Sequence, residues 1–237
     1  FVVIGTTLYA RDKYDGDELW SMRLPGVPST SPTADNNRLY VGTLEGSVYA
    51  FDLALIRRLN NEGRLAQYRD ETVVWRYQTS GEIVAAPVAD DKRVVFASKI
   101  GSLFAVTPNS RELAFQFESN APAAAPLDLV RSDEPGQDTI YYAAGDTNFY
   151  ALRAANGTTK WLYVAGSPIR EKPHPIGDSV YLVPVGAGMY DLSAENGRVR
   201  WWAPSARQFV AASPTRVYAT DEGGRIAARR REDVALR

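Results

Sequence analysis

Short apolar runs separated by turn residues recur along the chain, and residues 172–201 show this arrangement most clearly. Residues 179–183 form one apolar run, residues 189–192 are typical of a second short strand, and residues 198–201 alternate polar with apolar side chains, as a strand does. Asn196-Gly197 is typical of a tight hairpin turn. With the segment before residue 172 as a fourth, this stretch predicts four short antiparallel strands. Helical periodicity is nearly absent from the chain, which we therefore predict to be all-β.

An aromatic anchor recurs at one phase of this pattern, at Trp20, Trp75, Phe115, Trp161 and Trp201. The intervals between successive anchors are 55, 40, 46 and 40 residues. Four of the anchors follow another aromatic residue by 11 positions, and a proline follows every anchor 11 to 13 positions later. Four short strands in each period of about 40 residues predict a β-propeller built from four-stranded antiparallel blades.

The anchors divide the chain into blades, which we expect to form a single propeller domain over residues 1–237. The predicted blades are a partial one over 1–20, followed by 21–75, 76–115, 116–161, 162–201 and 202–237. The first blade lacks its innermost strand, and the anchor of the last blade would fall at position 238. We therefore expect a domain truncated at both ends, with six blades as a lower bound and seven or eight in a longer parent protein.

The segment that ends at each anchor carries a signature. Residues 10–20 have the pattern A-x-D-x-x-x-G-x-x-x-W, and residues 151–161 and 191–201 keep its glycine, within an Asn-Gly pair, and its tryptophan. This pattern resembles the tryptophan-docking repeat of the pyrroloquinoline-quinone-like propeller superfamily. Within that superfamily, the chain is most similar to the propeller lipoprotein of the bacterial β-barrel outer-membrane assembly machinery. It also resembles secreted propellers and the sensor domains of bacterial kinases.

The five anchors are predicted to dock one blade on the next. A tryptophan can bury a large flat face between two sheets while its ring N–H finds a hydrogen-bond acceptor. A role in stacking on a ligand is the alternative for these side chains.

Two cycles carry extra residues. The longer insertion covers residues 53–70, between the third and fourth strands of its blade, and its apolar spacing predicts a short amphipathic turn of helix that ends by Gly63. One interpretation is a surface loop that caps its own blade. The other is a partner contact, for which the candidate residues are Ile56, Arg57, Arg58, Leu59 and Tyr68. The second insertion, residues 131–138, joins a first to a second strand, so both insertions are expected on one face of the propeller.

The composition argues against a catalytic, metal-binding or cofactor-binding site. The chain has no cysteine and one histidine, His174, so we expect no thiolate metal site, no catalytic triad and no metal or cofactor. In the superfamily that the chain resembles, quinoprotein dehydrogenases typically hold their quinone against a vicinal disulfide, which this chain cannot form. We therefore predict that the protein is not an enzyme.

The resemblance implies a protein-interaction scaffold that works in a multi-subunit complex of the bacterial envelope. It implies a periplasmic or other extracytoplasmic location, with any membrane anchor in a part of the protein outside this chain. The near balance of 27 basic and 28 acidic residues argues against a nucleic-acid partner. The chain contains no apolar run of the length, about 18 residues, that a transmembrane segment needs. Two alternatives stay open: a fragment of a quinone-dependent dehydrogenase, and a ligand-sensing ectodomain of a membrane receptor or kinase.

Overall fold

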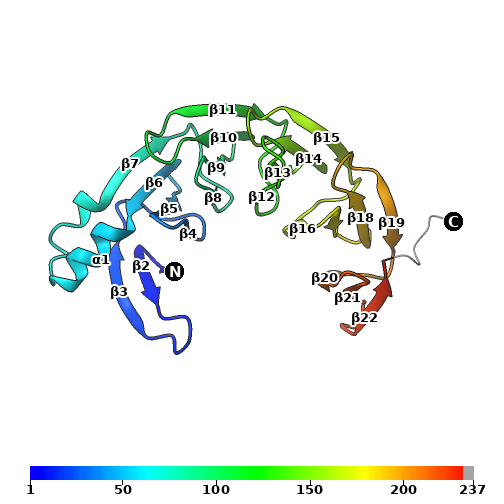
Figure 1. The fold of residues 1–237 in the computed structure, drawn as a ribbon, viewed down its shortest axis with the longest axis horizontal. Coiled ribbons are helices and arrows are strands. Elements are labelled where there is room, and N and C mark those ends of the chain that lie inside the picture. The colour runs from blue at the N-terminus through cyan, green and yellow to red at the C-terminus, as the bar shows by residue number, and fades with distance from the viewer. Residues whose placement is uncertain (232–237) are drawn as a thin grey trace. The chain divides into compact units, whose positions relative to one another are not determined.

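The computed structural model in Figure 1 describes residues 1–231 of the chain. These residues form six antiparallel β-sheets, a nine-residue α-helix and one short 3-10 helix. The chain divides into two compact units, Phe1–Pro122 and the residues from Ala123 onward.

The first unit contains three sheets and both helices. Its first sheet has three strands: β1 (Val2–Ile4), β2 (Thr7–Arg11) and β3 (Glu18–Arg23). Its second sheet has four: β4 (Thr33–Ala34), β5 (Arg38–Gly42), β6 (Ser47–Asp52) and β7 (Val73–Gln78). The helices α1 (Leu53–Asn61) and η1 (Arg69–Thr72) lie between β6 and β7 in the chain. The third sheet consists of β8 (Val88–Ala89), β9 (Val94–Ala97), β10 (Ser102–Val106) and β11 (Leu113–Glu118).

The second unit contains the other three sheets, and in all six the strands pair in chain order. The fourth sheet consists of β12 (Asp128–Val130), β13 (Thr139–Ala143), β14 (Asn148–Arg153) and β15 (Thr159–Val164). The fifth consists of β16 (His174–Ile176), β17 (Ser179–Leu182), β18 (Met189–Ser193) and β19 (Val199–Ala203). The sixth has three described strands: β20 (Gln208–Ala212), β21 (Arg216–Thr220) and β22 (Ile226–Arg230).

The centre of the second strand is apolar in most sheets, and in β5, β9, β13 and β17 both faces of this part are buried. In β5, Leu39 and Val41 pack in the core that lies against the first sheet, whereas Tyr40 points into the core shared with the third sheet. In β17, Val180 and Tyr181 divide in the same way between two cores of the second unit. Side chains alternate along a strand, so a continuous apolar run fills two cores at once.

Each aromatic anchor lies in the last strand of its sheet, directly across from a small residue in most cases. Trp75 pairs with Ala50 and Trp161 with Ala151, and a β-bulge next to each pair shifts the register by one residue. The Asn196-Gly197 turn leads into the Trp201 strand, and Gly197 has a φ of 71°, which glycine adopts without strain.

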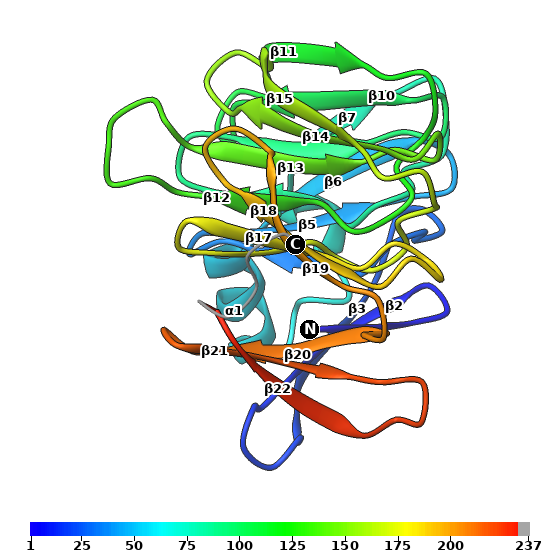
Figure 2. The same ribbon diagram turned by 90° about the vertical axis from the view of Figure 1, so that its right-hand side faces the viewer.

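Both insertions have the local structure that their sequences indicate. The first contains the nine-residue helix α1, which ends at Asn61, and Gly63 two positions later has a φ of 68°. The second is a loop that extends from the end of its sheet between β12 and β13 (Figure 2). Their placement on one common face, and a single domain over 1–237, stay predictions. The last predicted blade includes residues 232–237, which lie outside the described residues.

Candidate functional site

The longer insertion is the candidate contact surface, and its helix begins with a side-chain cap. Asp52 at the end of β6 accepts a hydrogen bond from the backbone N–H of Leu55 at 2.9 Å, which satisfies one of the free donors of the first helical turn. Arg58 lies in the last turn, where a positive charge favours the helix dipole. The helix is therefore well defined at both ends.

The inner face of α1 belongs to the protein core. Ile56 and Leu59 are 0% and 4% exposed, and they pack in one cluster with Trp20, Met22 and other apolar residues of β2 and β3. Ile56 and Leu59 are three positions apart, so their side chains lie on one side of the helix. Two of the five predicted contact residues are thus buried, and in this conformation they hold the insertion in place.

The outer face of α1 carries two of the other three predicted contact residues. Arg57 and Arg58 are exposed, and neither forms an ion pair with an acidic residue within the described part of the chain. Tyr68 is half-buried against the same core, and the Arg64 guanidinium lies 4.3 Å from the centre of its ring. Arg64 also bonds Glu62 at 3.0 Å. Of the insertion's exposed charges, Arg57 and Arg58 are therefore available to an external acid.

A groove of about 400 Å³ runs between the insertion and β3. One wall is formed by four consecutive residues of β3, and the other by insertion residues around the helix end: Glu18, Leu19, Trp20, Ser21, Asn60, Gly63, Leu65 and Ala66. Leu19 is 54% exposed, so it presents an apolar surface to the groove. Asn60 Nδ2 donates a hydrogen bond to the Leu19 carbonyl at 3.3 Å, which ties the two walls together.

The predicted docking anchors are buried, and two of them bond a neighbouring sheet. Trp75 Nε1 donates to the Pro108 carbonyl at 2.7 Å, and Trp161 Nε1 donates to the Ala194 carbonyl at 2.9 Å. Each acceptor belongs to the turn before the last strand of the next sheet. The other three anchors, Trp20, Phe115 and Trp201, are at most 9% exposed. All five side chains are therefore covered, which leaves no open ring face for a ligand to stack on.

Trp201 differs from the other anchors in its environment. Its Nε1 atom is buried without a hydrogen-bond partner among the described residues, as are Tyr181 Oη and Asp191 Oδ1. These residues pair directly across β17, β18 and β19. Asp191 occupies the position that alanine holds opposite Trp75 and the other anchors, and burial raises its pKa. Aligning the repeats by their anchors would have shown this substitution in the sequence.

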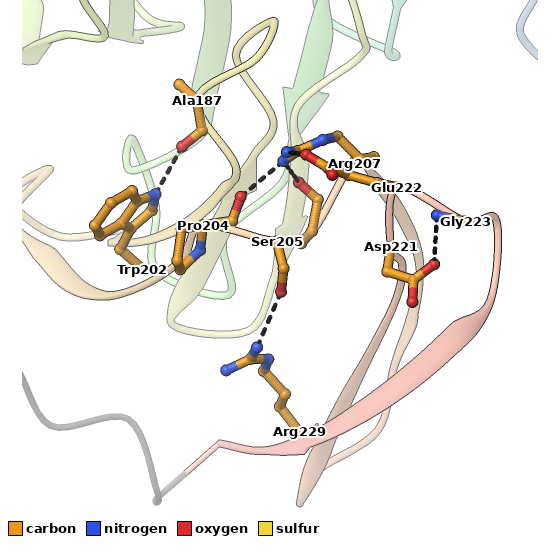
Figure 3. A network of polar contacts seen from close by, with 10 residues as sticks. Ala187, Trp202, Pro204, Ser205, Arg207, Asp221, Glu222, Gly223 and Arg229 are labelled. Atoms are coloured by element: carbon orange, nitrogen blue, oxygen red, sulfur yellow. Dashed lines mark hydrogen bonds and ion pairs between the residues drawn. The ribbon is translucent and has the colours of Figure 1, made fainter.

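A row of three aromatic side chains, of which Trp202 is exposed, is a second feature that the sequence pattern did not predict. Trp202 is 47% exposed, stacks on Tyr190 at 6.0 Å, and donates from Nε1 to the Ala187 carbonyl at 2.7 Å (Figure 3). Tyr190 in turn contacts Tyr163 at 5.9 Å, and burial with a neighbouring tyrosine raises the pKa of Tyr163 to about 12. In the sequence, the Trp201-Trp202 pair is the feature that could have indicated this row.

The charged groups near Trp202 are engaged in local structure. Arg207 donates to the Pro204 carbonyl at 2.7 Å and forms an ion pair with Glu222 (Figure 3). Arg229 Nη2 reaches Ser205 Oγ at 3.3 Å. These contacts connect the sixth sheet to the turn that follows β19. They account for the charges here as fold-stabilising contacts.

The lone histidine packs as an aromatic side chain. The His174 ring stacks on Phe209 with centroids 4.3 Å apart, and burial together with Lys172 lowers its pKa. Among residues 1–231, no group of three or more His, Cys, Asp or Glu side chains is arranged to hold a metal ion. Neither described helix is long and apolar enough to cross a membrane.

Antiparallel four-stranded sheets with aromatic anchors in their last strands define blades of the β-propeller class. The family model described as outer membrane protein assembly factor BamB matches the chain over residues 1–59, 55–161 and 135–237. The chain belongs to this family, which confirms the predicted relationship to quinone-like propellers. No curated protein matches the sequence.

Solved structures show the same fold at low sequence identity. BamB from Moraxella catarrhalis is 15% identical with a TM-score of 0.68, over 94% of this chain and 64% of that one. The computationally designed Ika8 protein is 13% identical with a TM-score of 0.68, over 91% and 62%. A chain of the mitotic checkpoint complex is 13% identical with a TM-score of 0.70, over 97% and 69%. The predicted all-β propeller fold is thereby confirmed, and the chain spans less than two thirds of the Moraxella protein.

Proposed function

We propose that this protein is a non-enzymatic scaffold that binds protein partners within an extracytoplasmic complex of a bacterial envelope. Membership in the family of an outer membrane assembly factor supports this setting.

The outer face of α1 is the proposed contact. The observation that carries this assignment is a helix with its apolar side locked in the core and two arginines on its exposed side. Because the helix is already ordered, its surface would lose little conformational freedom when a partner binds. Arg57 and Arg58 would attract an acidic surface, and such charges mainly raise the association rate and select the partner.

A charge-reversal experiment tests this proposal. The variant Arg57→Glu/Arg58→Glu should lose one set of partners when the full-length protein is purified from its native host by affinity capture and quantified by mass spectrometry. Two exposed arginines at about 0.5–1 kcal/mol each predict a fall in affinity of about tenfold. The matched control is Arg216→Glu/Arg225→Glu, which changes the net charge equally at two exposed positions of the second unit.

The control should retain the partners that the α1 variant loses. Equal capture by wild type and both variants would reject α1 as the contact, and equal loss in both would show a general effect of charge. Thermal unfolding of each variant checks that the fold is retained.

A further inference from the structure

The outer edge of β3 is open to pairing. The first sheet has the order β1-β2-β3, so one side of β3 has no strand beside it within residues 1–231. On that side lies the groove formed with the insertion, and α1 is seen next to β3 in Figure 1. An unpaired strand edge offers backbone donors and acceptors to any extended chain that reaches it.

The direction of the backbone groups in β3 follows from its register. Leu24 N–H donates to the Thr6 carbonyl at 2.8 Å, so this pair is hydrogen-bonded across the ladder. Hydrogen-bonded pairs alternate along an antiparallel ladder, which makes Met22 and Trp20 the next residues to bond toward β2. The backbone N–H and C=O of Ser21 therefore point away from β2.

Ser21 lines the groove, and its outward-pointing backbone N–H and C=O lie on this edge of β3. The Leu19 carbonyl points the same way, since it accepts the hydrogen bond from Asn60. The side chain of Leu19, which is 54% exposed, gives the groove an apolar surface beside these polar groups. Backbone hydrogen bonds combined with a pocket for alternate side chains are what strand addition requires.

The charge at the rim indicates the occupant. Arg57 lies three residues before Asn60 in α1, and therefore on the same side of the helix as this groove residue. Arg57 and its neighbour Arg58 are exposed and have no acidic partner within the described chain. Glu18, at the other end of the groove, is paired with Arg11 at 3.7 Å. On the α1 side of the groove, the charge without an acidic partner in the described chain is thus positive.

We propose that the groove between β3 and the insertion binds an extended segment of the partner, with alternating apolar and acidic residues, by adding it as a strand to the outer edge of β3. This inference rests on the proposed scaffold function and specifies how its partner is held. The segment pairs with the backbone of Ser21, places an apolar side chain against Leu19, and directs acidic side chains toward Arg57.

A defined peptide tests the proposal. The probe is a seven-residue acetylated and amidated peptide that alternates valine with glutamate, and the matched probe carries lysine in place of glutamate. The acidic peptide should bind the 237-residue chain and slow hydrogen exchange of the Ser21 amide by at least tenfold. The lysine peptide should bind at least tenfold more weakly. Exchange of Ser21 unchanged by the acidic peptide overturns the proposal.

Proline variants separate strand addition from simple charge attraction. Ser21→Pro removes an N–H that faces the groove and leaves the bonds to β2 in place, a change that an edge strand tolerates. It should weaken binding of the acidic peptide at least tenfold. The control is Arg23→Pro, which removes an outward N–H beyond the groove and should stay within twofold of wild type.

The outcomes distinguish this inference from the proposed function. Partner capture that depends on Arg57 and Arg58 but is unaffected by Ser21→Pro overturns strand addition and leaves the scaffold contact standing. Capture that is unaffected by either change rejects both. If Ser21→Pro does not fold, exchange protection of Ser21 in the wild-type chain decides the matter by itself.

Discussion

Replacing Trp161 with alanine tests whether an anchor docks one sheet on the next. The side chain is 7% exposed, and its indole N–H donates to the Ala194 carbonyl at 2.9 Å. Its ring contacts Tyr141 and Phe149 at centroid distances of 5.9 and 5.7 Å. The change therefore removes a large buried ring and leaves a carbonyl of the adjacent sheet unpaired.

The expected cost follows from these contacts. Deleting a large buried aromatic side chain lowers the free energy of unfolding by about 3–5 kcal/mol. The unpaired Ala194 carbonyl accounts for about 1 kcal/mol of that loss. For a chain of this length, we expect Tm to fall by roughly 6–20 °C. Trp161→Phe keeps most of the ring and loses the N–H, so it should cost about 1–2 kcal/mol.

Thermal and urea unfolding followed by circular dichroism provide the measurement. The matched control is Trp202→Ala in the same unit, since Trp202 is 47% exposed and should cost about 1 kcal/mol through its Ala187 hydrogen bond and Tyr190 contact. A Trp161→Ala variant no less stable than Trp202→Ala would refute the docking argument.

Two further changes probe the same unit. Gly197→Ala should destabilise by about 1–2 kcal/mol more than Gly16→Ala in urea unfolding. Both glycines have positive φ, but a Cβ at Gly197 would lie 2.6 Å from Trp161, whereas one at Gly16 would meet nothing within 4 Å. Equal losses of stability in the two variants would contradict the close approach of Gly197 to Trp161. Asp191→Ala should stabilise by about 1 kcal/mol at pH 7, because it removes a buried carboxylate whose Oδ1 has no partner in residues 1–231. Burial raises the folded-state pKa of Asp191, so wild-type stability falls as pH rises through that pKa, and the gain should vanish below the ordinary aspartate pKa; a gain that persists at pH 3 would exclude ionisation as its cause.

Much of the fold was predictable from sequence because it depends on local order. Alternating apolar runs, Asn-Gly turns and a recurrent aromatic anchor each specify a strand, a hairpin or a sheet contact within about 40 residues. Trp161 and Gly197 show why this works, since the anchor and the glycine that accommodates it are both parts of the repeat. The repeated unit therefore encodes both the blade and its packing on the next one.

The candidate site was only partly predictable. The apolar spacing of Ile56 and Leu59 indicated a helix with one apolar face, but such a face can bind a partner or pack on the protein itself. In the structure this face packs on the protein itself, because Trp20 and Met22 offer an apolar surface to α1 from a distant part of the sequence. If the insertion were only a surface loop, deletion of residues 56–67 would leave the fold intact. In this structure, the deletion would also remove core side chains.

By itself, the sequence determined the all-β repeat, the anchors and the presence of a helical insertion, because each depends on residues close together in the chain. Only the tertiary structure shows that Ile56 and Leu59 are buried and that Arg57 and Arg58 are exposed. It also decided that the Ser21 backbone faces a groove and that Asp191 is buried beneath Trp201. These properties depend on which distant segment covers a side chain or leaves a strand edge open, and residue spacing does not contain that information.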